Sequence, residues 1–565
     1  MPVSMLPIIL VGCSWLVPDH IAPWTSFHTE VPAFFAVLLM CYIYWRSSQQ
    51  ELKVSVAVWP LLLLIASPWI QWGLGHLCYV GDAVIASLYL TAFTLAWVFG
   101  HHGAQINKQT QWSLVEQISL VVLFVGLVVA LQIFVQWLKI EVYFHGWILE
   151  GLPMGRMRAN IGQPNQAATT VLMAIVAAAV LFCSRRLGGR VCWLSVVVLT
   201  WAMVLTQSRT ALLSCLVILV MLNLLLSQRL KLIEVSIAIE RRQLIFWLLL
   251  VIGMTWVFQV LELIGVTGGA GLKQLAQPGT RTIIWTQIVI AILEKPWFGY
   301  GWLQIAAAQQ VGALNFPGAE QTNYSHNIIL DLFAMLGVPI GLLIVSGVGY
   351  FFWSRVDSVR KSIGAIFALF ILIPFGIHCN LEFPHAYAYF IVLAGLLLGV
   401  IDAETQPRFT KKGLSYKKII LCLGLFWSGL LILTGYEYVL VEEDFRINRF
   451  ENRRVGTTPS DHVPPRPYLL TQMGEMLMSM RMRAQPNMTQ SDLEVLIRAS
   501  NRYSWAPLQF RTALALALNG RFKESEHQLR TIKGLFSEEI YNEAKETLIR
   551  MRQEKYPELV GLTIP

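Results

Sequence analysis

His326 is the residue whose type and position most suggest chemistry. It lies in the stretch TNYSHNIILDL (residues 322–332), between a polar loop and the start of a long apolar run. A neutral imidazole accepts a proton near neutral pH, so histidine is well suited to act as a general base. A single histidine at a helix start more commonly has a capping or structural role. Both interpretations stay open until the surrounding segments are placed.

Two arginines have the chemistry to bind phosphate. Arg209 lies in TQSRTALL (residues 206–213), a very short turn between two apolar runs, and Arg281 precedes an amphipathic segment. A planar guanidinium carries a fixed fork of donors that suits bidentate contact with phosphate. The alternative is an arginine that lies along the membrane surface and keeps its charge in water.

A dense group of amides occupies RMRANIGQPNQAATT (residues 156–170), where Gly162 and Pro164 interrupt any helix. Amides offer paired donors and acceptors without charge, so they suit sugar hydroxyls or the edge of a phosphate. The alternative is a polar turn that caps the next helix. The side chains considered for binding are those of Arg158, Gln163, Asn165 and Gln166.

The segment HCNLEFPHAYAYF (residues 378–390) contains His378, Glu382 and His385. This spacing invites a metal-site interpretation, but the HExxH pattern is absent and Pro384 interrupts the helix. We therefore expect no metal. Glu382 is better interpreted as a hydrogen-bond or ion partner of an arginine or histidine on the same face of the membrane.

The segment 265–326 joins several of these features. It opens with the glycine-rich GVTGGAGLKQ, which lacks the GK[ST] ending of a nucleotide-binding loop. It continues with TRTIIWTQIVIAILEKPWFGYGW, in which Trp297, Tyr300 and Trp302 could stack on sugars. The commoner role of such aromatic residues is to lie in the lipid interface, and that alternative stays open.

The elements that must position these side chains are membrane helices. The chain has 565 residues, 55% of them hydrophobic and only 14% charged, whereas soluble domains average about 25% charged residues. The apolar runs predict an all-α polytopic protein of about 13 transmembrane helices. They cover residues 3–18, 32–46, 54–70, 83–100, 114–138, 167–183, 191–206, 211–227, 244–264, 327–352, 362–378, 385–401 and 419–437.

The distribution of charge predicts the orientation of these helices. With a cytoplasmic N-terminus, 18 Lys and Arg residues fall in the inner loops and 7 in the outer loops, as the positive-inside rule requires. The outer basic residues are Lys139, Arg156, Arg158, Arg209, Lys273, Arg281 and Lys295. Because they oppose this rule, we expect some of them to bind an anion at the outer surface; the alternative is that they only keep the outer loops solvated. The net charge of +9 is spread between apolar runs and gives no sign of nucleic-acid binding.

The composition of the chain changes near residue 440, after which charged residues become frequent. Residues 506–550 have helical periodicity with an Asn-Gly turn, in a rhythm similar to a tetratricopeptide (TPR) repeat. We expect residues 1–150 to form N-terminal transmembrane helices, 151–438 a transmembrane core with the loop 265–326, and 439–565 a helical extramembrane domain. The first apolar run lacks a basic flank and is expected to be a retained span. The cysteines suggest no metal or redox site, although a disulfide between Cys78 and Cys379 is conceivable.

Together these segments resemble a known family. SRTALL, the Arg281 segment with Trp285, EKPWFGYGW and SHNIILDL look like the core of the O-antigen ligase/polymerase (Wzy_C-like) superfamily. GQPNQ and HCNLEFPHAYAYF narrow the resemblance to the PglL-type O-linked protein oligosaccharyltransferases. The resemblance spans roughly residues 150–400, and the charged tail is also similar to that group's C-terminal region.

The resemblance implies a GT-C-like glycosyltransferase of the bacterial inner membrane, with its active site and C-terminal domain in the periplasm. It would transfer a glycan en bloc from undecaprenyl pyrophosphate to Ser or Thr of a protein such as pilin, without metal or cofactor. The family's essential histidine falls on His326, and its donor-binding arginines fall on Arg209 and Arg281. Further binding residues would be Arg158, Gln163, Asn165, Gln166, Tyr300, Asn327, Glu382 and His385, and Ser325 would cap the helix after His326.

The same segments also fit other functions. The same superfamily includes O-antigen ligases, which use lipid A core as acceptor, and O-antigen polymerases. A transporter or flippase would also have many spans, but it would be expected to carry charged residues near the middle of its helices. These apolar runs contain almost none.

Overall fold

The computed structural model describes residues 5–47, 55–106, 111–151, 155–227, 235, 237–265, 279–318, 320–405, 416–458 and 461–565. Its secondary structure in these ranges is entirely helical. The chain divides into two compact units. Unit 1 comprises Met1–Leu63, Tyr89–Gln277 and Gly349–Ser428, and unit 2 comprises Leu64–Leu88, Pro278–Val348 and Gly429–Pro565. The described part of the predicted glycine-rich stretch ends at Gly265, and the rest of GVTGGAGLKQ and Lys273 lie outside the described residues.

Apolar helices account for all the predicted spans. Eight helices in the described part of the chain are long and apolar enough to cross a bilayer, and five shorter apolar helices have 10–17 residues. The all-helical, polytopic character of the protein is thereby supported, while the number of spans stays a prediction. Unit 1 contains α1 (Met5–Ser14), α2 (Phe27–Ser47), α5 (Leu114–Trp137), α6 (Pro164–Cys183), α7 (Gly189–Leu205), α8 (Arg209–Leu225), α9 (Arg241–Leu263), α16 (Ile363–Cys379) and α17 (Ala388–Thr405).

Four helices begin in one unit and end in the other: α3 (Trp59–Gly73), α4 (Val80–Ile106), α14 (Val338–Trp353) and α18 (Tyr416–Arg453). Helix α18 has 38 residues, which at about 1.5 Å per residue gives roughly 57 Å. That length is about twice the thickness of a hydrocarbon core. The helix therefore extends well beyond the predicted last span, which ends at residue 437.

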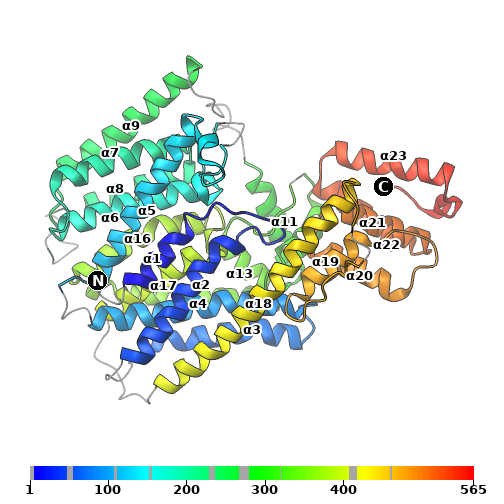
Figure 1. Cartoon of the computed structure of the whole chain (residues 1–565), viewed down its shortest axis with the longest axis horizontal. Helices are drawn as coiled ribbons and strands as arrows, with labels where there is room; N and C mark the ends of the chain where they lie inside the picture. The colour runs from blue at the N-terminus through cyan, green and yellow to red at the C-terminus, as the bar shows by residue number, and fades with distance from the viewer. Residues whose placement is uncertain are drawn as a thin grey trace. The chain divides into compact units, whose positions relative to one another are not determined.

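Small residues let the helices of unit 1 pack closely. Neighbouring helices include α5 with α6, α6 with α7, and α16 with α17 (Figure 1). Helix α17 also approaches α4 at Gly399, where an added Cβ would lie 2.2 Å from the carbonyl oxygen of Trp97. Such backbone contact is typical of membrane helices, which gain little from burying apolar surface and associate through close packing.

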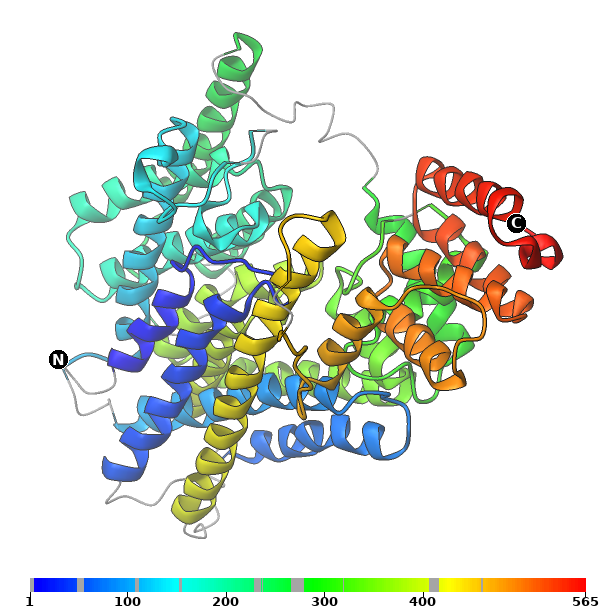
Figure 2. The ribbon, with the colours of Figure 1, turned by 45° about the vertical axis from the view of Figure 1, so that its right-hand side comes forward.

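Unit 2 packs short helices from the predicted outer loop against the tail. The loop supplies α11 (Arg281–Glu294) and α12 (Ile305–Asn315), and α13 (Ile328–Leu336) follows directly after it. The tail supplies α19 (Thr471–Arg481), α20 (Gln490–Arg502), α21 (Ala506–Leu518), α22 (Phe522–Leu535) and α23 (Glu538–Glu554). The tail helices lie side by side in chain order (Figures 1 and 2), and α12 packs on α20 and α22. Sequential helix packing accords with the predicted helical tail but does not establish a TPR fold.

Polar contacts fix the tail to the rest of unit 2. Arg502 on α20 donates through Nη2 and Nε to Asp82 at the start of α4, at 2.9–3.1 Å, and the Asp82 side chain is fully buried. Asp82 also accepts from Gln304 Nε2 at 2.8 Å. Gln310 on α12 donates to Ser504 Oγ at 2.7 Å. The tail is thus bound to the helices that precede His326 in the sequence.

One predicted span is interrupted. The apolar run 327–352 forms two helices, α13 and α14, with Gly337 at φ +81° between them. An added Cβ on Gly337 would lie 2.3 Å from the carbonyl oxygen of Trp297, and the amide of Val338 donates to the carbonyl of Pro296 at 2.7 Å. The prediction of one continuous span was wrong here, because hydropathy cannot detect a positive φ. The described structure also has all eight cysteines free, so no Cys78–Cys379 disulfide forms.

Candidate active site

The loop that carries His326 is anchored on its N-terminal side. The side chain of Ser325 is fully buried, and its backbone amide donates to Asp331 Oδ1 at 2.7 Å. The carbonyl of Ser325 accepts from Trp285 Nε1 at 2.9 Å. Asp331 is itself buried, with 2% of its surface exposed. The residue before the histidine is therefore bound both to α13 and to α11.

On the C-terminal side, Asn327 is the N-cap of α13. Its Oδ1 accepts from the amides of Ile329 at 3.0 Å and Leu330 at 3.2 Å. The prediction that Ser325 caps this helix was wrong. Its hydroxyl instead donates to the carbonyl of Asn327 at 2.9 Å and accepts from the Asn327 amide at 3.3 Å. Both serine and asparagine can act as N-caps. Here the bond from the Ser325 amide to Asp331 holds Ser325 before the helix, and Asn327 takes the N-cap position.

His326 has φ +60°, in the left-handed region that non-glycine residues rarely adopt. Such a conformation costs of order 1–3 kcal/mol and persists where the surrounding structure over-determines it. The contacts of Ser325 and Asn327 supply that constraint here. The His326 side chain is half-buried, so the loop holds it at the start of α13 without enclosing it.

Arg281 lies on the helix that contacts this loop. It is the first residue of α11, one turn before Trp285, whose indole contacts the carbonyl of Ser325. Residues four apart share one face of a helix. Arg281, which is half-buried, therefore belongs to the face of α11 that meets the His326 loop.

Amide side chains hold the segment that leads into the loop. Gln309 Oε1 accepts from the Thr322 amide at 2.9 Å, and its Nε2 donates to the Glu320 carbonyl at 2.9 Å. Gln309 Nε2 also donates to Gln287 Oε1 at 3.1 Å. Gln287 and Gln309 are both fully buried. Buried amides on α11 and α12 thus hold the segment that leads into the loop.

Tyr300 occupies a structural position in the same unit. Its hydroxyl donates to the Ala291 carbonyl at 3.2 Å, and its ring belongs to the buried cluster of α11, α12 and α13. The ammonium of Lys295 lies 4.7 Å from the ring centroid. Burial raises the pKa of Tyr300. These contacts leave the ring little surface for stacking on a sugar.

Unit 1 contains a second polar cluster, centred on Asn165 at the start of α6. Arg156 Nη2 donates to Asn165 Oδ1 at 3.1 Å, and Asn165 Nδ2 donates to Glu382 Oε1 at 3.0 Å. Arg156 Nε also donates to the Thr206 carbonyl at 3.2 Å. We refer to Arg156, Asn165 and Glu382 as the Asn165 cluster. The last two side chains are buried.

The neighbouring amides stabilise the same region. Gln163 is the N-cap of α6 and accepts from the Gln166 amide at 2.7 Å. Gln166 Oε1 accepts from the Tyr389 hydroxyl at 3.1 Å, inside unit 1. The capping role that the sequence left open for this segment is therefore present in the structure.

The remaining candidates of unit 1 differ in exposure. Arg158 donates through Nε and Nη2 to the Glu150 carbonyl at 3.2 and 2.9 Å, and burial lowers its pKa. Arg209 is the exposed first residue of α8, after the N-cap Ser208. His385 lies half-buried in the short helix η5 (Pro384–Ala386). Arg209 keeps the position expected of a surface anion ligand.

The structure therefore divides the predicted site residues between the units. His326, Asn327, Arg281 and Tyr300 belong to unit 2, and the others belong to unit 1. Sequence reasoning missed two partners: Arg156 beside Asn165, and Asp331 beside Ser325. Asp331 gave a usable signal, because an acidic residue inside an apolar helix requires a buried partner. Arg156 gave no signal that separated it from Arg158.

Two family models match separate parts of the chain. A family model described as "O-Antigen ligase" matches residues 194–345, and one described as "Virulence factor membrane-bound polymerase, C-terminal" matches residues 366–548. The first match contains Arg209, Arg281 and His326.

Two curated relatives come from Acinetobacter baylyi. Its general O-oligosaccharyltransferase is 25% identical over 94% of this chain and 92% of the relative. Its ComP-specific O-oligosaccharyltransferase is 27% identical over 75% of each chain. The chain is therefore similar to proteins of the O-antigen ligase superfamily and, over most of its length, to O-oligosaccharyltransferases of the PglL type.

Proposed function

We propose that this protein is an O-oligosaccharyltransferase that moves a glycan en bloc from undecaprenyl pyrophosphate to Ser or Thr of periplasmic proteins, pilin among them. The names of the two relatives support transfer of an oligosaccharide to protein. The donor lipid, the acceptor and the bacterial inner membrane as its location are parts of the proposal. The exposed arginine Arg209 and the half-buried Arg281 are suited to a pyrophosphate.

The observation that carries the proposal is the conformation of His326. A strained, half-buried histidine is held between two anchored neighbours. Sparsely populated backbone conformations cluster at functional sites, where the surrounding structure offsets their cost. A histidine that only ended a helix would not require this arrangement, because Asn327 already caps α13.

The proposed reaction is a direct displacement at the anomeric carbon of the glycan. The neutral imidazole of His326 accepts the proton of the acceptor hydroxyl as the new oxygen–carbon bond forms. The bond from the anomeric carbon to the pyrophosphate oxygen breaks with its electron pair, and the configuration inverts. Arg281 and Arg209 stabilise the negative charge that develops on undecaprenyl pyrophosphate. The reaction needs neither metal nor cofactor.

We assign the other predicted binding residues either to the structure around the site or to contact with the glycan or the acceptor. Glu382 and Asn165 bond to each other, so we assign them first to holding the start of α6 in place. Gln163 and Gln166 serve the same helix start. His385, Arg158 and Asn327 stay candidates for contact with the glycan or the acceptor, while Tyr300 is assigned to the core.

The arrangement of unit 2 supports a periplasmic location for the tail. The tail helices bond to the start of α4 and to α12, and the charge distribution puts both of those segments on the outer side. A tail on the opposite side of the membrane could not make these contacts. We therefore propose a cytoplasmic N-terminus, with His326 and the tail in the periplasm.

A second candidate function is ligation of O-antigen to lipid A core, or its polymerisation. The descriptions of the two matching family models favour it. The same histidine and arginines would serve, and only the acceptor would differ. The full-length match to a general O-oligosaccharyltransferase favours protein as the acceptor.

The deciding experiment mixes the purified protein with a lipid-linked glycan, a pilin-like acceptor protein and lipid A core, in the presence of EDTA. We expect a mass increase on the acceptor protein equal to the whole glycan, located on Ser or Thr. Glycan on lipid A core would identify a ligase, and lengthened lipid-linked glycan would identify a polymerase. Movement of the donor across liposomes without any transfer would favour a flippase.

A further inference from the structure

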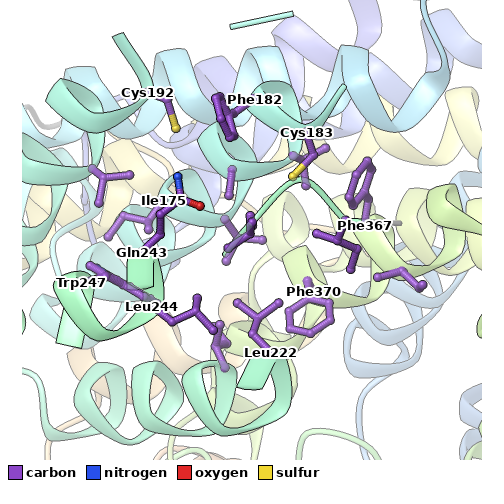
Figure 3. Close-up of a pocket in the computed structure, with 18 of the residues that line it drawn as sticks. Ile175, Phe182, Cys183, Cys192, Leu222, Gln243, Leu244, Trp247, Phe367 and Phe370 are labelled. Atoms are coloured by element: carbon purple, nitrogen blue, oxygen red, sulfur yellow. The ribbon is translucent and has the colours of Figure 1, made fainter. Parts of the chain in front are cut away.

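A pocket in unit 1 lies at one end of five apolar helices. It is lined by the second halves of α6 and α8 and by the beginnings of α7, α9 and α16, and it encloses about 100 Å³. Side chains such as Phe182, Leu222, Leu244 and Phe370 form its walls (Figure 3).

Three polar atoms of the lining residues are bonded within the protein, and the lining is otherwise almost entirely apolar. Gln243 Oε1 accepts from the Glu240 amide at 2.8 Å. Trp247 Nε1 donates to Thr200 Oγ1 at 3.2 Å, and Cys192 Sγ donates to the Ala178 carbonyl at 3.6 Å. A ligand in this pocket would therefore meet hydrocarbon and aromatic surface. That chemistry suits an alkyl chain and not a polar metabolite.

Basic residues flank the pocket on three of its segments. Arg185 follows the lining residue Cys183 by two positions, Arg190 precedes Cys192 by two, and Arg241 precedes Gln243 by two. All three arginines are exposed. The charge distribution assigns these helix ends to the cytoplasmic side, where anionic lipids attract basic residues at the membrane surface.

We propose that this pocket binds one acyl chain of an anionic phospholipid from the cytoplasmic leaflet, with the lipid phosphate held by Arg190 and Arg241. An apolar wall inside the membrane and cations at its rim match the two ends of such a lipid. The bilayer also supplies the lipid at high concentration. This site is separate from the transfer reaction, and its occupancy does not depend on the proposed function.

The test uses the full-length protein in nanodiscs that contain phosphatidylglycerol with a photoreactive diazirine in one acyl chain. After illumination, crosslinked peptides are mapped by mass spectrometry. We expect crosslinks on pocket residues of α6, α7 and α9. Val196→Trp fills the pocket from a 7% exposed lining position and should reduce those crosslinks about tenfold.

A matched control lies on the same helix. Leu194 is 65% exposed on α7 and does not line the pocket, so Leu194→Trp should leave the crosslinks unchanged. Equal labelling of the pocket in Val196→Trp, or labelling confined to exposed outer faces, would overturn the proposal. Elution on size-exclusion chromatography checks that each variant is folded.

The headgroup is tested with the double variant Arg190→Gln/Arg241→Gln. Each arginine near a membrane surface contributes about 1 kcal/mol, so loss of both should lower the labelling of the pocket by phosphatidylglycerol about thirtyfold, to the level seen with phosphatidylcholine. Arg46→Gln, on a helix that contributes nothing to the pocket, should have no effect. Equal labelling by both lipids in the unsubstituted protein would contradict an anionic ligand. Displacement by a polyprenyl phosphate but not by unlabelled phosphatidylglycerol would overturn the proposal in favour of the donor's own chain.

Discussion

The Asn165 cluster and the His326 loop are both polar and both expected at the outer side of the membrane, yet they are built differently. In the Asn165 cluster the polar side chains bond to one another, and those of Asn165 and Glu382 are buried. In the His326 loop the neighbours of the histidine are anchored while its own side chain stays half-buried in a strained conformation.

From this difference we infer that the Asn165 cluster stabilises the fold and that the His326 loop takes part in the reaction. Buried polar groups that satisfy each other stabilise one arrangement of the backbone, which suits the Asn165 cluster to holding α6 against its neighbours. Strained backbone that is offset by adjacent contacts is typical of functional sites, which suits His326 to a role in the reaction. Variants in the two regions should therefore change different quantities.

The largest effect is expected for His326→Ala. A general base typically contributes 10²–10⁴-fold, so the rate of glycan transfer should fall by about that factor, while the amount of folded protein in the membrane is unchanged. Transfer is measured as the mass shift of the acceptor protein. His145 is the matched control, because it is an exposed histidine with φ +48° in a segment also predicted to be outside. Full activity of His326→Ala would contradict the assignment of the reaction to the His326 loop.

A smaller effect is expected for Arg281→Lys. This change keeps the positive charge but loses the planar, forked set of N–H donors of the guanidinium. Loss of one hydrogen bond to a charged group costs about 1.5–3 kcal/mol, so donor binding should weaken about ten- to a hundredfold. Binding of the lipid-linked glycan to the immobilised protein measures this directly. Arg446→Lys, in an exposed ion pair of the tail, serves as the control. Unchanged donor affinity in Arg281→Lys would argue against bidentate contact.

Asp331→Asn tests whether the anchor of the loop matters for the reaction. The amide oxygen can still accept from Ser325, but without the charge that strengthens the bond. We expect kcat to fall about tenfold with little change in the KM for the donor, since positioning of His326 is affected and donor contacts are not. A change in KM alone would show that the loop binds the donor and does not position the base.

Asn165→Ala should have the smallest effect on transfer and a clear effect on stability. Removal of the amide leaves Arg156 and Glu382 each without one partner, which costs about 1–3 kcal/mol. The melting temperature in detergent should drop, while kcat and KM change by less than about threefold. The opposite result, an unchanged melting temperature with a raised KM, would assign Asn165 to substrate binding as its residue type first suggested.

The apolar helices could be predicted from the sequence because each contains a run of apolar residues that only a bilayer or a core can accommodate. The segment 167–183, for example, corresponds to α6, which begins three residues earlier at Pro164. The amide-rich start of α6 could be recognised as a turn from Gly162 and Pro164. The family resemblance likewise depended on short motifs and not on tertiary contacts.

Other features depended on residues far apart in the chain. Asn165 and Glu382 are 217 positions apart, and their bond follows from the packing of α6 and α16. The cap of α13 could not be predicted, because Ser325 and Asn327 are both good caps and only the buried contact with Asp331 decides between them.

The sequence by itself determined that this is a helical membrane protein with a charged helical tail, since composition and hydropathy act locally along the chain. It also identified His326 and the arginines as candidates by residue type. The tertiary structure alone decided that His326 adopts a positive φ, that Trp285 joins the Arg281 helix to its loop, and that Arg502 binds the tail to Asp82. The physical reason is that strain and buried pairing arise only when distant segments pack together.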